Sequence, residues 1–315
     1  MTDALRGDRA RQAFVVRESR DVESLVGILR GERLHAAYAL AQMEPEAFQH
    51  ARCWLSDDVS SGGASAGGPF SGGLFSGGLG PLGSLVCHSR AGLGDATFVL
   101  GDPAGVARIL SLHPGPFQTF LTARPAHLDV LEDAFRLRHA RTMLRMHVNR
   151  ERFRRVEGPS FRLRPTHARA LNRLYSSDGG PTSYQARHLT EGCYFGVEEE
   201  GRLLAVAGTH AISPSHGIAV VGNVFTHPRA RGRGLATMTT SAVTALLLQD
   251  QRDVVLSVDP TNGPAIRAYR RLGYTDVGEI VEAGGQRRAA TLRTSLRRLL
   301  AGYRGRRDGV EVVRG

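Results

Sequence analysis

The chain has 315 residues, 41% of them hydrophobic, which suits two domains of ordinary size with buried cores. No apolar run approaches the roughly 20 residues of a membrane-spanning helix, and the charged start of the chain is unlike a secretory signal, so we expect a cytoplasmic protein. The net charge of +11 comes from arginine alone, because the sequence contains no lysine, and so complete a bias weakens any inference from charge to nucleic acid.

The first part of the chain, residues 1–155, has the alternating pattern of an α/β domain. Spaced apolar residues predict helix within 23–43. The Gly- and Ser-rich segment 60–84 predicts a flexible, disordered insertion in this domain, with a lid that uses Phe70, Leu74 and Phe75 as the alternative. After it we expect strand, helix, strand, helix and strand at 96–102, 103–113, 116–123, 126–138 and 140–148.

The second part, residues 156–285, follows a polar, basic connection at 149–160. The order of its elements indicates a mixed α/β sheet with parallel strands in the middle. We expect a short strand and a helix within 161–178, a β-hairpin at 192–212, a strand at 216–226, a helix after residue 234, a strand at 253–260, a helix at 262–273 and a strand at 274–283.

The stretch "HPRARGRGLAT" places glycines where the strand 216–226 passes into a helix. The first N–H groups of a helix lack intrahelical partners, and the helix dipole adds positive charge there. Gly232 and Gly234 let a bulky ligand approach this backbone closely. The stretch therefore predicts an anion site, most naturally for phosphates.

The last segment, residues 286–315, is an arginine-rich tail. Leu292, Leu296, Leu299 and Tyr303 would share one face of a helix, which favours a terminal helix packed on the domain. Binding to an anionic membrane, binding to nucleic acid and a disordered end stay open as alternatives. Cys53, Cys87 and Cys193 have no metal-site spacing, so we expect no metal, small apolar roles for all three, and a reducing compartment.

Two motifs together resemble the GNAT superfamily of acyl-CoA-dependent N-acetyltransferases over about residues 161–283. The first is Arg229, Gly232 and Gly234 between a strand and a helix. The second is "VDPTNGPAIRAYRRLGY", with Asn262, Ala265, Tyr269 and Gly273-Tyr274. The resemblance implies a GNAT fold for the C-terminal half. Residues 36–148, which repeat the order of elements without the glycine pair, resemble a degenerate copy, as in tandem proteins of this family.

The resemblance also implies a site for acetyl-CoA as co-substrate. Backbone N–H groups of Arg231, Gly232, Arg233, Gly234, Leu235 and Ala236 would hold the pyrophosphate. The pantetheine arm would run along Val224, Phe225 and Thr226, where a backbone N–H could polarise the thioester carbonyl. Asn262 would bond the same arm or cap its helix. Tyr269 would protonate the departing thiolate or pack in the core.

The sequence departs from the family in its general base. A carboxylate is usual on or near the strand before the glycine turn, but no Asp or Glu occurs between Glu200 and Asp250. The candidates are Glu198, Glu199 and Glu200 at the hairpin turn, and His210 and His216 flanking a loop. A water chain that ends at a backbone carbonyl is a further candidate.

The leading hypothesis is an enzyme that transfers acetyl from acetyl-CoA to a small-molecule or peptide amine by direct attack in a ternary complex. No Cys or Ser is paired with a His in a way that predicts a covalent intermediate. The missing carboxylate motivates a second hypothesis, a non-catalytic acyl-CoA sensor. A nucleic-acid-binding module that uses the tail is the third, and has no recognition motif to support it.

Overall fold

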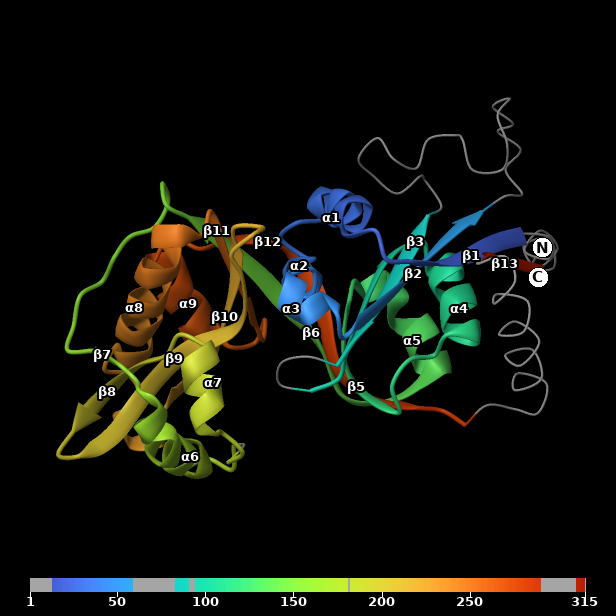
Figure 1. The fold of residues 1–315 in the computed structure, drawn as a ribbon. Helices are drawn as coiled ribbons and strands as arrows, with labels where there is room; N and C mark the ends of the chain where they lie inside the picture. The colour runs from blue at the N-terminus through green and yellow to red at the C-terminus, as the bar shows by residue number, and fades with distance from the viewer. Residues whose placement is uncertain (1–12, 59–82, 91–93, 181, 290–309, 315) are drawn as a thin grey trace, which may run out of the picture. The chain divides into compact units, whose positions relative to one another are not determined.

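The computed structural model describes residues 13–58, 83–90, 94–180, 182–289 and 310–314 (Figure 1). The chain divides into two compact units. Unit 1 comprises Met1–Arg141 and Val281–Gly315, and unit 2 comprises Thr142–Ile280. The sequence-based division at 155/156 falls in the connection after strand β6, whereas the unit boundary at 141/142 falls inside that strand.

Unit 1 carries helices α4 and α5 beside a mixed sheet (Figure 1). Strands β1 to β4 pair antiparallel in chain order, and β4 pairs with β5 in parallel. Its elements are β1 (Ala13–Ser19), α1 (Val22–Gly31), α2 (Ala37–Ala41), α3 (Pro45–Phe48), β2 (Ala51–Asp58), β3 (Ser84–Ser89), β4 (Ala96–Gly101), α4 (Pro103–Leu112), β5 (Gln118–Ala123), the 3-10 helix η2 (Pro125–His127), α5 (Leu128–Ala134), the start of β6 (Phe135–Asn149) and β13 (Val310–Arg314).

Unit 2 repeats this plan. Strands β7 to β10 pair antiparallel in chain order, and β10 pairs with β11 in parallel. Its elements are the end of β6, β7 (Phe161–Arg162), the 3-10 helix η3 (Pro165–His167), α6 (Ala168–Ser176), α7 (Ala186–Glu191), β8 (Phe195–Glu199), β9 (Arg202–Ser213), β10 (Ile218–Thr226), the 3-10 helix η4 (Pro228–Ala230), α8 (Leu235–Asp250), β11 (Asp253–Val258), α9 (Gly263–Arg271) and the start of β12 (Thr275–Arg287).

The same order of elements therefore occurs twice along the chain: a strand, helices, three strands, a helix, a strand, a helix and a strand. The fold class predicted from the sequence, a mixed α/β sheet, is confirmed, and so is a first half that copies the second. The copy was recognisable because the strand and helix periods alternate in both halves in the same order.

The two copies exchange their last strands. Residues Leu144–Asn149 of β6, which end the first copy, pair antiparallel with β11 in unit 2. Residues Val281–Gln286 of β12, which end the second copy, pair antiparallel with β5 in unit 1. Each unit is thus completed by the other half of the chain, so a cut between the two sequence-defined domains would leave each unit without one of its strands.

Each unit has its own core. In unit 1, α4 and α5 bury Val106, Ile109 and Leu131 against the strands, together with Trp54 and Phe135. In unit 2, α8 and α9 bury Val243, Leu247 and Tyr269 against β6, β10 and β11. Leu171 and Leu174 of α6 pack in a separate cluster with Tyr194. Helices α6 and α8 therefore belong to different hydrophobic clusters, and the strands of unit 2 contribute apolar side chains to both clusters.

The helix predicted at 126–138 is shorter in the structure. Helix α5 ends at Ala134, and β6 begins at Phe135 rather than at residue 140. Phe135 and Leu137 are covered while Arg136 and Arg138 are exposed, which is the alternation of a strand. The full burial of Phe135 in the core of unit 1 favours the extended conformation here.

Some sequence predictions lie outside the described residues. The insertion expected at 60–84 falls there except for its last two residues, and so do the tail positions Leu292, Leu296, Leu299 and Tyr303. The end of the tail is described as strand β13, which pairs antiparallel with β1.

The expectation of three separate cysteines was wrong for two of them. Cys53 and Cys87 lie opposite each other in the β2–β3 pair, with Cα atoms 4.1 Å apart, and form a disulfide. Strand register brings them together across 34 residues of sequence, which no local spacing reveals. The scattered cysteines therefore no longer argue for a reducing compartment. Cys193 is a buried free thiol, as expected.

Candidate functional site

Strands β10 and β11 separate part of the way along their length. They pair in parallel from Ile218 to Val221, and β10 then continues to Thr226. Among the described residues, no strand pairs with that side of β10 beyond Val221. Val224, Phe225 and Thr226, predicted to bind an extended arm, lie in this segment, whose backbone can pair with a ligand as it would with an added strand. The buried Thr226 hydroxyl has no partner within the described chain.

The glycine turn joins the end of β10 to α8. Gly232 and Gly234 have φ angles of 78° and 76°, in the left-handed region that favours glycine. A Cβ placed on either glycine would meet no described atom within 4 Å, so the space above the turn is open. Helix α8 begins at Leu235, with Gly234 as its N-cap and no described side chain bonded to its first N–H groups. The turn therefore offers N–H groups and a helix dipole to a ligand.

In unit 1 the equivalent helix start, that of α4, is capped by a side chain. Asp102 is the N-cap of α4, and its carboxylate accepts a hydrogen bond from the Gly105 N–H at 3.1 Å. A carboxylate at this position takes the place of a bound anion and repels phosphate. The first copy has thus kept the fold while losing the open helix start.

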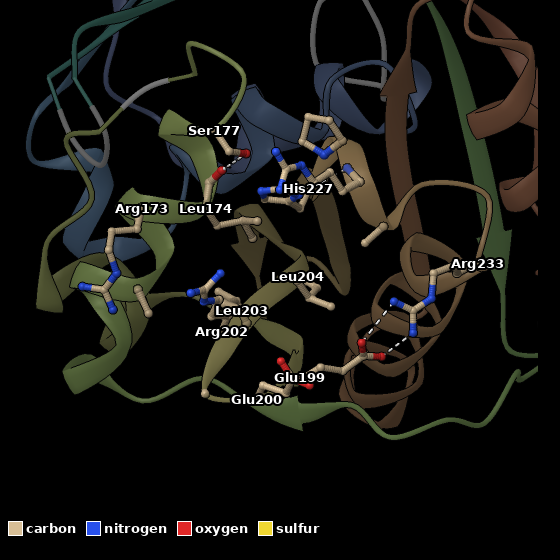
Figure 2. Close-up of a pocket in the computed structure, with 15 residues that line it drawn as sticks. Arg173, Leu174, Ser177, Glu199, Glu200, Arg202, Leu203, Leu204, His227 and Arg233 are labelled. Carbon is tan, nitrogen blue, oxygen red and sulfur yellow. Dashed lines mark hydrogen bonds and ion pairs between the residues drawn. The ribbon is translucent and has the colours of Figure 1, made fainter.

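Two arginines of the glycine turn are held by acidic residues of unit 2. Arg231 forms an ion pair with Asp178, just after α6, and Arg233 forms a two-point pair with Glu199 on β8. Figure 2 shows the Arg233 guanidinium facing Glu199. Both pairs are about half exposed, so solvent screens them. Because these side chains are already paired, the backbone of the turn is the part that faces open space.

A cavity of about 800 Å³ lies beside the turn, between α6 and the β8–β9 hairpin (Figure 2). Four arginines and two glutamates line it together with His227, so its charge is positive. Its lining residues are Ala170, Arg173, Leu174, Ser177, Glu199, Glu200, Gly201, Arg202, Leu203, Leu204, His227, Pro228, Arg229, Ala230 and Arg233.

The second motif lies on α9. Asn262 is the N-cap of this helix, and its Oδ1 accepts a hydrogen bond from the Ala265 N–H at 3.2 Å. Its side-chain amide nitrogen can still donate. Tyr269 is 7% exposed in the core of unit 2, with its ring centroid 6.1 Å from that of Tyr274. Burial raises the pKa of Tyr269 to about 12, and its hydroxyl has no hydrogen-bond partner among the described residues.

The sequence prediction missed Asn223. The pairing of β10 with β9 is irregular between Gly222 and Phe225, and Asn223 adopts a φ of 53° in this bulge. Asn and Gly are the residues that tolerate this conformation best, so "GN" inside an apolar strand was the available signal. Bulges often lie next to active sites, where they redirect backbone groups.

Asn223 is the centre of a hydrogen-bond network. Its side-chain nitrogen donates to the Tyr194 hydroxyl at 3.0 Å, and its Oδ1 accepts from the Tyr184 hydroxyl at 2.7 Å. The same Oδ1 lies 3.0 Å from Nε2 of His210. The Tyr175 hydroxyl donates to the backbone carbonyl of Asn223 at 2.6 Å. These contacts come from α6, from the segments just before α7 and β8, and from β9, and they hold the bulge in a defined shape.

The candidate bases lie in different places. Glu198, Glu199 and Glu200 are exposed at the β8–β9 turn, and Arg233 lowers the pKa of Glu199 through a hydrogen bond. His216 lies in the turn between β9 and β10. His210 is exposed on β9 beside the bulge. Of these five residues, His210 contacts the bulge, next to the point where β10 separates from β11.

Neither a metal-binding cluster nor a membrane-spanning helix occurs among the described residues. No group of three or more His, Cys, Asp or Glu side chains there is arranged to hold a metal ion. No helix in the same part of the chain is long and apolar enough to cross a bilayer.

Residues 160–274 match the profile of the acetyltransferase (GNAT) family. No curated protein sequence matches the chain. A solved structure of a Drosophila protein has a TM-score of 0.58 at 14% identity and covers 86% of this chain and 98% of that one. A GNAT-family putative acetyltransferase from Novosphingobium aromaticivorans has a TM-score of 0.48 at 23% identity, and the match covers 61% of this chain and 84% of that one. A tandem GNAT protein from the clavulanic acid biosynthesis pathway has a TM-score of 0.48 at 15% identity, and the match covers 88% of this chain and 99% of that one.

Proposed function

We propose that this protein, whose residues 160–274 form a domain of the acetyltransferase (GNAT) family, transfers an acetyl group from acetyl-CoA to an amine. Family membership supports an acyltransferase. The acetyl donor, the amine acceptor and direct attack in a ternary complex are our proposal. Acetyl-CoA is a co-substrate here, and no metal takes part in the proposed reaction.

The observation that carries this proposal is the open start of α8. Gly232 and Gly234 hold left-handed backbone below open space, and no described side chain occupies the first N–H groups of the helix. The backbone from Gly232 to Ala236 is therefore suited to a pyrophosphate, whereas the N–H of Arg231 donates to the Pro228 carbonyl at 3.4 Å. In unit 1, Asp102 fills the equivalent position, so we assign cofactor binding to unit 2 alone.

The unpaired side of β10 suits the pantetheine arm. The amides of this arm can bond the backbone of Val224, Phe225 and Thr226, and the Thr226 hydroxyl is a buried polar atom that needs a partner. Backbone N–H groups redirected by the bulge can stabilise charge that develops on the thioester oxygen. Asn262 can donate its amide hydrogen to the same arm while its oxygen caps α9.

Tyr269 supports the leaving step. Because burial keeps its hydroxyl protonated at all ordinary pH values, it can donate a hydrogen bond to the departing sulfur. The hydroxyl has no protein partner among the described residues and remains available for this contact. The amine then attacks the thioester carbonyl directly, and no acyl-enzyme is needed.

The test is calorimetric titration of acetyl-CoA into the protein and into Gly234→Glu. The new carboxylate would stand at the helix start, as Asp102 does in unit 1, and we expect binding to be lost. Gly201→Glu is the matched control, because Gly201 also has a positive φ of 72° and open surroundings but lies at the hairpin turn. Equal loss in both variants would argue for a general effect of backbone strain and against the phosphate turn.

Thiol release with amines then separates catalysis from binding. Release of CoA that depends on the added amine supports the transferase. Tight binding of acetyl-CoA without release for any amine would favour the acyl-CoA sensor. Absence of binding to the unsubstituted protein would contradict both.

A further inference from the structure

We propose that the cavity between α6 and the β8–β9 hairpin is a second binding site, for a small compound that carries two or more carboxylate or phosphate groups. This ligand is distinct from the proposed co-substrate, and its binding does not depend on the proposed transfer. Three features of the cavity support the site: unpaired arginines, an apolar wall, and a position across β10 from the segment proposed for the pantetheine arm.

Three arginines of the cavity have no described partner. Arg173 comes from α6, Arg202 from the start of β9 and Arg229 from η4. All three residues are exposed, and no hydrogen bond or ion pair engages their guanidinium groups in the described part of the chain. Figure 2 shows Arg173 and Arg202 among the residues that line the cavity. Three separate elements therefore present guanidinium groups to one space.

The unpaired charges of the cavity are mostly positive. Arg233 and Glu199 neutralise each other as an ion pair, so Glu200 is the remaining carboxylate among the described lining residues. The three unpaired arginines exceed it by two positive charges. A hollow surface with one predominant sign of charge concentrates counter-ions. Each guanidinium can bind a carboxylate or a phosphate through two parallel N–H donors, so a ligand with several such groups fits better than one with a single group.

Apolar side chains form much of the remaining wall. Leu174 and Leu203 are 3% and 7% exposed, and both line the cavity together with Pro228 and Ala230. Such a wall can contact the short carbon skeleton that joins the anionic groups of a ligand. It also limits the water around the ion pairs, which strengthens them relative to pairs on an open surface.

The cavity lies on the β9 side of strand β10. The His227 N–H donates to the Leu204 carbonyl at 2.8 Å, so the pairing with β9 continues past the end of β10, and both residues line the cavity. The segment Val224–Thr226, proposed for the pantetheine arm, has its unpaired side on the opposite side of β10. The two sites therefore lie on either side of one strand, and both ligands can be bound at once.

One residue links the cavity to the glycine turn. Arg233 stands between Gly232 and Gly234, lines the cavity, and pairs there with Glu199. An anion in the cavity competes with Glu199 for this guanidinium and adds negative charge near the turn. Each ligand should therefore weaken the other by the same limited factor, because the two repel each other without sharing space.

The experiment titrates citrate and 3-phosphoglycerate into the protein by calorimetry, at neutral pH and constant ionic strength. We expect Arg173→Gln and Arg202→Gln each to weaken binding about fivefold or more, and the double variant to weaken it further. Arg169→Gln is the matched control, because Arg169 is an exposed arginine of α6 that does not line the cavity. Acetate, which has a single carboxylate, should bind much more weakly. Thermal unfolding should show unchanged midpoints, since the substituted side chains have no described partner.

Two further measurements separate the cavity from the cofactor site. Gly234→Glu should lose acetyl-CoA and keep citrate binding within about threefold, because the glycine turn is not needed for citrate. In the unsubstituted protein, citrate should raise the Kd of acetyl-CoA about two- to fivefold and then level off. A Kd that keeps rising in proportion to citrate would show direct competition and overturn a separate site.

The remaining outcomes are equally decisive. Binding of neither probe, or an equal loss in Arg169→Gln and Arg202→Gln, would overturn the proposal in favour of a solvated arginine surface. If Arg202→Gln weakened CoA but not dephospho-CoA, the cavity would belong to the 3′-phosphate of the cofactor, which also overturns a second site. If citrate bound but acetyl-CoA did not, the proposed transfer would fail and the cavity site would stand.

Discussion

Arg233 and Glu199 form a two-point ion pair that ties the glycine turn to strand β8, with Nη1 of the arginine 3.1 Å from Oε2 of the glutamate. The hydrogen bond from Arg233 lowers the pKa of Glu199, so the pair is fully ionised at neutral pH. Glu199 therefore places a negative charge beside a turn that we expect to receive phosphates. The pair competes with the ligand for the same arginine.

We predict that Glu199→Gln strengthens acetyl-CoA binding about two- to fivefold at low salt, since it removes this repulsion and releases Arg233. The gain should shrink as salt is added, because both side chains are exposed and screened. Titration calorimetry at two salt concentrations measures it. Glu198→Gln removes the same charge from a neighbouring exposed position with no described ion pair, and should have a smaller effect. Weaker binding by Glu199→Gln would mean that the pair shapes the turn.

Tyr269→Phe should lower the turnover number at least about tenfold while leaving acetyl-CoA affinity and unfolding free energy nearly unchanged. The ring remains in the core, and the hydroxyl that is removed has no described partner. Tyr274→Phe is the matched control. Its hydroxyl bonds the Thr244 hydroxyl at 2.7 Å in the same core, so that variant should lose about 1 kcal/mol of stability and keep its turnover number. An unchanged turnover number in Tyr269→Phe would remove the acid role.

Asn262 has two separable tasks, and two substitutions distinguish them. Asn262→Ala removes the N-cap of α9 and should cost about 1 kcal/mol of unfolding free energy. Asn262→Asp retains a capping oxygen but loses the amide donor. If the amide binds pantetheine, the Asp variant should recover stability and still bind acetyl-CoA weakly. Chemical unfolding and calorimetry measure the two effects. Full affinity in Asn262→Asp would reduce this residue to a helix cap.

The sequence revealed those parts of the site that depend on local backbone chemistry. A glycine turn before a helix has the same requirements wherever it occurs, so Gly232 and Gly234 could be placed from spacing alone. Asn223 was missed because a bulge depends on the register of β9 against β10, which the residue types along β10 do not reveal by themselves. The disulfide between Cys53 and Cys87 was missed for the same reason.

Strand exchange was equally beyond a sequence-based prediction. Each half contains the right order of elements. The alternation of apolar and polar residues along β6 and β12 predicts a strand but does not determine which strand it pairs with. The helix predicted over 126–138 shows a related limit. Over so short a segment, the spacing of Phe135 and Leu137 fits both the helix and the strand period. The burial of Phe135 in the core of unit 1 favours the strand.

The last prediction concerns the stability of unit 1 and depends on His88. This imidazole is buried, donates through Nε2 to the backbone carbonyl of His113 at 3.0 Å, and accepts from the Thr97 hydroxyl at Nδ1. Burial lowers its pKa to about 4, because the charged form loses its water. Between about pH 6.5 and pH 4 the unfolded chain therefore binds a proton that the folded one does not. The free energy of unfolding should fall through this window as pH drops, by about 3 kcal/mol in all.

Urea unfolding at several pH values, followed by tryptophan fluorescence, measures this loss. Trp54 is the only tryptophan of the chain and stacks on His113 at a centroid distance of 4.8 Å, so its emission reports on unit 1. His88→Gln should be less stable at pH 7, because its flexible amide does not reproduce both hydrogen bonds of the imidazole, but it should lose much less on acidification. Burial also lowers the pKa of His127 in the same unit, so a smaller slope should remain. If the variant lost stability over this window as steeply as the unsubstituted protein, His88 would not be the group that makes unit 1 sensitive to acid.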